Sequence, residues 1–368
     1  MNKLILISLS IFLLQGCFLK ENPISSSMKD DSFLDEILKN KENHELQIIY
    51  TEIKRDKEGD PDFIDFEFQV DENNYFYPAS SIKLPIVILT LDKINELRSE
   101  GINVSLKSKI TLSPLDQEMS LTQKDSITSF QNLIADIFLV SDNSASNVLI
   151  DFVGYNHFNT KMNQAGFNKT YLNHKFSPDP YYTIDWEIKT MLNDRISSNE
   201  DRDIVTADDN TLGLKKGEKK FKDGIVEFGS LDFSQKNRSS IMDMHNIIKR
   251  IIFPSKFDDD NAFNLNVEDY DFLRYWMSRF TYEDLGNKFT TDKKYFESYN
   301  KFFIHGVDTV VTNKNIRVYN KIGQAYGTSV DNAYIRNYQD DVEFFLTATI
   351  YTNKNNIIND NVYEYDET

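Results

Sequence analysis

The sequence predicts a mixed α/β protein in which strands lie near both ends of the chain and helices lie between them. Phe66, Phe68 and Val70 alternate with polar residues, which is the pattern of a strand with one face in water. An apolar run of helical length follows Ser80, and the C-terminal part of the chain returns to strand patterning.

Length and composition indicate a globular protein. The 368 residues can bury a sizeable core, as one large domain or as two lobes, and 40% of them are hydrophobic. The formal net charge of −17 argues against nonspecific nucleic-acid binding, because phosphate binding requires clustered lysine and arginine. We therefore expect no nucleic-acid partner.

The first 17 residues are typical of an export signal. Met1-Asn2-Lys3 is a short basic start, and the apolar run from Leu4 to Leu14 is too short to span a bilayer comfortably. Leu14-Gln15-Gly16-Cys17 resembles the lipobox of bacterial lipoproteins, whose cysteine becomes the lipidated first residue. We expect Cys17 to anchor an exported protein to the cell envelope, on its periplasmic or outer-surface side. A secretory signal or anchor that happens to contain a cysteine is the alternative.

Cys17 is the only cysteine, so the sequence excludes internal disulfides and a cysteine-based metal site. Residues 18–31 are polar and are predicted to form a tether. A helix is predicted from Ser32 to Lys41, where apolar residues recur at helical spacing. Strands are predicted over 46–53 and 63–70, joined by a turn.

The middle of the chain is mostly helical in pattern. Pro85 lies near the start of the helix after Ser80, where a missing N–H costs least. Residues 193–235 are charged and lack periodicity, so we interpret them as an exposed insertion. The other predicted helices cover 130–140, 148–152, 241–251 (capped by Ser239 or Ser240) and 266–282, and the C-terminal strands cover 317–322, 331–338 and 342–351.

Ser80 and Lys83 form a Ser-x-x-Lys motif at the start of a helix. On a helix these side chains share one face, so the amine can take the hydroxyl proton and make the oxygen a nucleophile. The pattern also occurs at Ser26/Lys29 and Ser298/Lys301. Those pairs lie in polar stretches with no apolar helix behind them, and we interpret them as exposed.

Two further motifs follow Ser80 in order. Ser141-Asp142-Asn143 occurs once in the chain, and Lys321-Ile322-Gly323 lies on a predicted strand. The trio resembles the signature of the class A β-lactamase and penicillin-binding-protein superfamily. The resemblance extends over roughly residues 45–352, given the matching order of elements.

This resemblance implies an α+β fold with two lobes in one serine hydrolase domain, residues 32–355. The sheet lobe would be antiparallel and built from both chain ends, residues 32–76 and 300–355, with helices against it. The helical lobe would comprise residues 77–299, and the site would lie at the junction.

The resemblance also implies a role for each motif residue. Ser80 would be the acylated nucleophile, and Lys83 the general base or proton relay. Ser141 would pass a proton to the leaving nitrogen, Asn143 would bind the substrate amide, and Lys321 would supply positive potential.

The oxyanion hole would consist of the backbone N–H groups of Ser80 and Gln324, and Gly323 would belong to the substrate-binding strand. The expected substrate is a small molecule or a peptidoglycan-related compound, bound by a monomer without a cofactor.

Several neighbouring residues have a structural interpretation. Asp142 is expected to hold its loop through backbone hydrogen bonds, because aspartate in turns commonly does so. Asn147 and the Tyr326-Gly327 pair are expected to serve packing and turn geometry. Lys321 could alternatively be an ordinary edge-strand lysine. The histidines are scattered without metal-ligand spacing, so we predict no metal site.

Two departures from the family pattern bear on activity. Class A enzymes carry an omega-loop glutamate that activates the deacylating water. The corresponding stretch, residues 169–179, has none, and Phe176 or Ser177 falls near its position. Ile322 also replaces the hydroxyl residue that helps to hold a substrate carboxylate.

Three hypotheses follow from the sequence. The first is a β-lactamase-like serine hydrolase that forms an acyl-enzyme on an amide or β-lactam bond. The second is a D-alanyl-D-alanine peptidase-like or esterase-like hydrolase with weak lactamase turnover. The third is a non-catalytic tethered binding protein that has kept the scaffold.

Overall fold

The computed structural model describes residues 22–115, 125–176, 184–192, 194–198, 202–257, 262–284, 286, 288–306 and 308–367. The predicted signal, Cys17 and the end of the omega-loop stretch lie outside these residues. No helix in the described ranges is long and apolar enough to cross a membrane.

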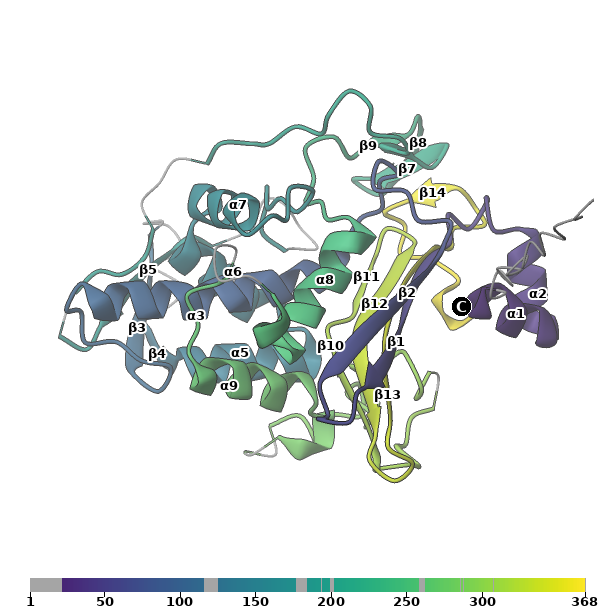
Figure 1. Ribbon diagram of the computed structural model, residues 1–368. Helices are drawn as coiled ribbons and strands as arrows, with labels where there is room; N and C mark the ends of the chain where they lie inside the picture. Colours follow the sequence, from purple (N-terminus) through teal and green to yellow (C-terminus); the bar gives the residue numbers. More distant parts are fainter. Residues whose placement is uncertain are drawn as a thin grey trace, which may run out of the picture.

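A six-stranded antiparallel sheet forms one lobe, and strands from both chain ends build it (Figure 1). Its order is β10-β12-β13-β1-β2, and β11 extends β10 along β12. The strands are β1 (Gln47–Arg55), β2 (Pro61–Phe68), β10 (Ile316–Asn320), β11 (Gly323–Ala325), β12 (Thr328–Asn337) and β13 (Val342–Tyr351). The predicted sheet is therefore confirmed, including the full extent of β13.

Alternate residues of β1 cover the two faces of this sheet. Ile49 points into a cluster with residues of α8 (Ile241–Ile252), which lies on the face toward the helical lobe. Ile48 and Tyr50 point the other way and pack with residues of α1 (Pro23–Asp30) and α2 (Ser32–Lys39). This period-two alternation lets one strand serve two cores.

The helical lobe surrounds α3 (Lys83–Ser99), which is buried on all sides along its first half. Pro85 lies in the first turn of α3, where backbone N–H groups have no partner within the helix. The lobe also contains α5 (Phe130–Val140), α6 (Asn143–Val153), α7 (Tyr155–Gln164), α9 (Val267–Met277) and the small sheet β4-β3-β5, made of β3 (Lys109–Pro114), β4 (Ser126–Ser129) and β5 (Trp186–Thr190).

The N-terminal part of the body differs from the prediction. Residues 23–30 of the predicted tether form helix α1, and Ile24 and Met28 are buried against Phe68 of β2. The sequence is polar on average, so its helicity depends on this contact rather than on local propensity. Helix α2 ends at Lys39, two residues earlier than predicted.

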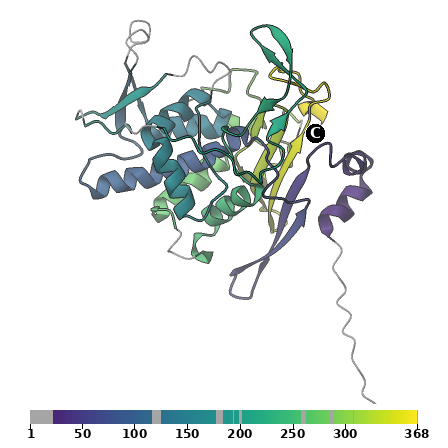
Figure 2. The ribbon, with the colours of Figure 1, turned by 90° about the horizontal axis from the view of Figure 1, so that it is seen from above.

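The interpretation of residues 193–235 as a wholly exposed insertion is also wrong in part. This segment contains β6 (Lys215–Lys216), β7 (Lys219–Lys222), β8 (Ile225–Phe228) and β9 (Leu231–Asp232), and β14 (Ile357–Ile358) pairs with β7. The β7–β8 hairpin projects from the body (Figure 2). Phe233, however, is buried against Tyr75 and Tyr77, because the aromatic rings supply apolar area that the charged residues lack.

Candidate active site

Ser80 lies in a short 3-10 turn (Ala79–Ile82) that leads directly into α3. Ala79 has a left-handed backbone with φ of 48°, which turns the chain sharply before the serine. Ser80 is half-buried, whereas Lys83 is 0% exposed. The turn therefore leaves the hydroxyl residue near the surface and the amine beneath it.

Ser141 follows the last residue of α5 and also has a left-handed backbone, with φ of 57°. Asp142 then caps α6, because its carboxylate accepts the Ala145 N–H at 2.7 Å. The structural interpretation of Asp142 is confirmed. The cap fixes the direction in which Ser141 and Asn143 leave the helix ends.

Lys83 and Lys321 converge on Ser141 from different lobes. Lys83 Nζ donates to the Ser141 carbonyl oxygen at 2.5 Å and to Asn143 Oδ1 at 2.6 Å, and it lies 3.5 Å from Ser141 Oγ. Lys321 Nζ donates to Ser141 Oγ at 2.9 Å. One hydroxyl is thus held between two amines.

The strand predicted over 317–322 ends two residues earlier, so Lys321 lies just beyond it. β10 ends at Asn320 and β11 begins at Gly323, although both pair with β12 in the same register. Lys321 Nζ donates to the Ile322 carbonyl oxygen at 2.9 Å as well as to Ser141. The ammonium therefore folds back over its own backbone, and with 2% exposure Lys321 is not an ordinary edge-strand lysine.

Gly323 brings the start of β11 against the serine turn. A Cβ atom on Gly323 would lie 2.6 Å from the Pro78 oxygen, 2.8 Å from the Ser81 nitrogen and 2.9 Å from the Ser80 nitrogen. Only glycine permits this approach. The backbone at Gly323 therefore lies directly against the backbone of Ser80 and Ser81.

A sequence model of the β-lactamase enzyme family matches residues 31–364 of the chain. The chain belongs to the β-lactamase enzyme family. No match was found among curated proteins.

Several solved structures resemble this family member. A β-lactamase from Sphaerobacter thermophilus is 14% identical, with 90% of this chain and 89% of that chain covered and a TM-score of 0.48. A class A β-lactamase representative from Bacteroides cellulosilyticus is 11% identical, with 87% and 88% covered and a TM-score of 0.47. A structure of PBP-A is 14% identical, with 88% and 86% covered and a TM-score of 0.47.

Burial lowers the pKa of both amines in the site of this β-lactamase-family protein. Burial, together with the nearby charge of Lys321, holds the pKa of Lys83 well below its usual range. Burial also lowers the pKa of Lys321 to about 7, although the carboxylate of Asp331 opposes the shift. In its neutral form Lys83 has a lone pair that can accept a proton.

Phe176, which falls near the position of the family's omega-loop glutamate, lies on one side of the site. Its ring faces Lys83, with Nζ 4.7 Å from the ring centroid. Asn147 fixes the Phe176 backbone, because Oδ1 accepts its N–H and Nδ2 donates to its carbonyl oxygen, both at 2.8 Å. The packing role predicted for Asn147 is thus confirmed.

The interpretation of Ser298 and Lys301 as an exposed pair is wrong, since each is 1% exposed. Ser298 donates to the Asp308 carbonyl oxygen, and Lys301 donates to the carbonyl oxygen of Met277. Their local sequence is polar, and only the three-dimensional packing of α9 and the sheet buries them. Nothing in their local sequence pattern indicates this burial.

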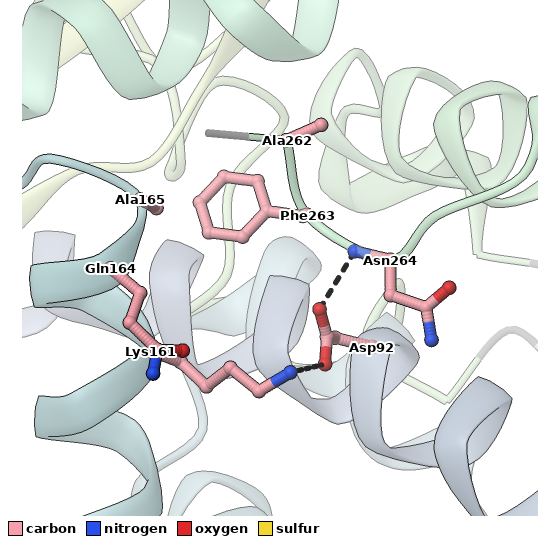
Figure 3. Close-up of a pocket in the computed structure, with 7 residues that line it drawn as sticks. All are labelled: Asp92, Lys161, Gln164, Ala165, Ala262, Phe263 and Asn264. Carbon is pink, nitrogen blue, oxygen red and sulfur yellow. Dashed lines mark hydrogen bonds and ion pairs between the residues drawn. The ribbon is translucent and has the colours of Figure 1, made fainter. Parts of the chain in front are cut away.

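A separate pocket lies between α3, α7 and residues 262–264 (Figure 3). Asp92 there accepts from Lys161 Nζ at 2.9 Å and from the Asn264 N–H at 2.8 Å. Asp92, Glu96 and His157 lie near enough to share a metal ion. Lys161, however, already binds both carboxylates, so this cluster is an ion pair network that joins α3 to α7.

Proposed function

We propose that the protein is a serine hydrolase that forms an acyl-enzyme at Ser80 on an amide or β-lactam bond. The observation that carries the proposal is the Ser141 hydroxyl, which lies between the buried amine of Lys83, one turn after Ser80, and the buried amine of Lys321. Substrates of this type are small molecules or peptidoglycan-related compounds.

The reaction begins with proton transfer from the Ser80 hydroxyl to the neutral amine of Lys83. Ser80 Oγ then attacks the substrate carbonyl carbon, and the backbone N–H groups of Ser80 and Gln324 stabilise the oxyanion. Ser141 gives its proton to the leaving nitrogen as the C–N bond breaks, and it is reprotonated from Lys83. Asn143 binds the substrate amide, and the Lys321 ammonium supplies positive potential beside Ser141.

Hydrolysis of the acyl-enzyme requires a base for water, and Phe176 cannot act as one. Ile322 is buried and has no hydroxyl for a substrate carboxylate. These two features favour the second candidate function, a peptidase-like or esterase-like hydrolase with weak β-lactamase turnover. In this case the acyl-enzyme persists after a β-lactam has reacted.

The test is covalent labelling of the purified protein with a fluorescent penicillin and with a general serine-hydrolase probe. We expect labelling that is lost in Ser80→Ala and kept in Ser144→Ala, which removes an exposed hydroxyl of α6 nearby. Equal labelling of Ser80→Ala and the parent would refute the role of Ser80. No labelling by either probe would favour the non-catalytic binding protein.

The rate of acylation is expected to fall above about pH 7, the pKa to which burial lowers Lys321. Below this pH the Lys321 ammonium is charged, and above it the positive potential beside Ser141 is lost. The initial labelling rate between about pH 5 and pH 9 measures this dependence. A rate that rises through the whole range would contradict it.

We also propose that Cys17 is lipidated and anchors the protein to the cell envelope, a proposal supported by the sequence alone. Metabolic labelling with radioactive palmitate should mark the parent protein and not Cys17→Ser. If the parent is not labelled, the lipid anchor is absent.

A further inference from the structure

A buried polar network lies directly behind Lys321. Lys301 Nζ donates to the carbonyl oxygen of Met277 and to Asn320 Oδ1, both at 2.7 Å. Asn320 Nδ2 donates to Asp331, at 2.8 Å to Oδ1 and 3.0 Å to Oδ2. One amide therefore bridges a buried ammonium and a buried carboxylate, and it belongs to the residue immediately before Lys321.

The same network reaches α5, the helix that ends just before Ser141. Asn320 Nδ2 lies 3.1 Å from the Asn300 carbonyl oxygen. The Asn300 side chain donates to the carbonyl oxygens of Phe138 in α5 and of Arg279, both at 2.9 Å. Two residues separate Phe138 from Ser141. The network thus ties together the two chain segments whose side chains meet at Ser141 Oγ.

The charges around Lys321 come from three other elements. Asp331 on β12 raises the pKa of Lys321, whereas Lys83 at the start of α3 and Lys301 in the loop before β10 carry a like charge only when they are protonated. Glu283 and Arg317 act in turn on Lys301, with opposite signs. The buried carboxylate of Asp331 therefore interacts with two buried amines, those of Lys321 and Lys301.

Each group in the network is costly to bury alone, so the network is sensitive to the loss of any partner. Burial lowers the pKa of Lys301 to about 7 and raises the pKa of Asp331 to about 6. Asp331 also accepts the N–H groups of Phe302 and Phe303, at 3.2 and 3.3 Å, which favours its ionised form.

We propose that Lys301, Asn320 and Asp331 are positioning residues that hold Lys321 against Ser141 and set the pH range in which Ser80 is acylated. This inference rests on the proposed acylation of Ser80. It assigns a role to residues outside the three motifs, none of which contacts the substrate.

The test compares pH profiles of labelling for Lys301→Met and Asp331→Asn. Without Lys301, the Asp331 carboxylate interacts with Lys321 alone, which raises the pKa of Lys321. The pH at which the acylation rate falls should therefore rise by about one unit. Without the Asp331 carboxylate, the pKa of Lys321 falls, so the pH at which the acylation rate falls should decrease by about one unit. Lys249→Met is the matched control, because Lys249 is also buried but pairs with Asp65 on β2.

A purely structural role would lower the rate equally at every pH and leave the profile in place, and this result would overturn the proposal. Opposite shifts in the two variants cannot arise from a general loss of stability. Melting temperatures identify a variant that does not fold. In that case the pH profile of the other variant tests the proposal.

A readout without catalysis separates this inference from the proposed function. The titration of Lys321 is followed by NMR of its side-chain Cε–H signals, assigned with Lys321→Met. Suppose that the parent protein is never labelled but the Lys321 titration shifts in opposite directions in the two variants. The proposed function is then wrong, and the role of the network in setting the titration of Lys321 is supported. An unshifted titration overturns the network.

Discussion

Phe176→Glu is expected to accelerate release of the acyl group from Ser80 by about 100-fold or more, the usual contribution of a general base. The Phe176 ring faces Lys83, so a carboxylate at this position would lie beside the site and could activate a water. Asn147 would continue to hold the backbone, since its contacts to residue 176 involve only main-chain atoms.

The new carboxylate should also favour the charged form of Lys83 and slow the first step. Acylation and release therefore have to be measured separately, by labelling with a fluorescent penicillin and by loss of label after the free probe is removed. Phe176→Gln is the matched control, because glutamine has the shape of glutamate without the base. Equal release rates in the two variants would contradict the assignment.

Gly323→Ala is expected to reduce acylation by about 100- to 1,000-fold, the typical effect of losing an oxyanion-hole donor. The added methyl group would lie within 2.9 Å of three backbone atoms of the serine turn. Backbone atoms cannot rotate away as a side chain can, so β11 has to move from the turn. This movement would disrupt the proposed oxyanion hole at Ser80 and Gln324.

Gly286→Ala is the control for this substitution, since a Cβ atom there meets nothing within 4 Å and the residue has no left-handed backbone. Labelling rates are compared with melting curves of the same variants. An acylation rate for Gly323→Ala close to that of the parent would show that the turn and β11 need not touch for the reaction.

The main parts of the candidate site could be predicted from the sequence because each is a short local pattern. Ser80 and Lys83 are one helical turn apart, and Ser141 lies between two apolar helices. The strand patterns placed Lys321 close to the sheet edge that faces Ser80. These features depend on spacing and alternation, which a single sequence contains.

Other features depend on contacts between distant segments and could not be predicted. Helix α1 has a polar sequence, and only its contact with β2 explains why Ile24 and Met28 are buried. The burial of Lys301 results from packing between α9, β10 and β12. The contact of Phe176 with Lys83 requires the fold of a loop whose sequence has no regular period.

The pairing of β1 with β13 has a consequence for the folding of a newly made chain. Gln47 of β1 pairs with Thr349 of β13. The β1–β2 hairpin therefore cannot form its remaining strand contact until β13, near the C-terminus, has been synthesised. During synthesis the β1–β2 hairpin has an unprotected edge, where a strand of another molecule could add. A two-stranded hairpin is marginally stable by itself, which points to a need for protection of the nascent chain until its last strands emerge.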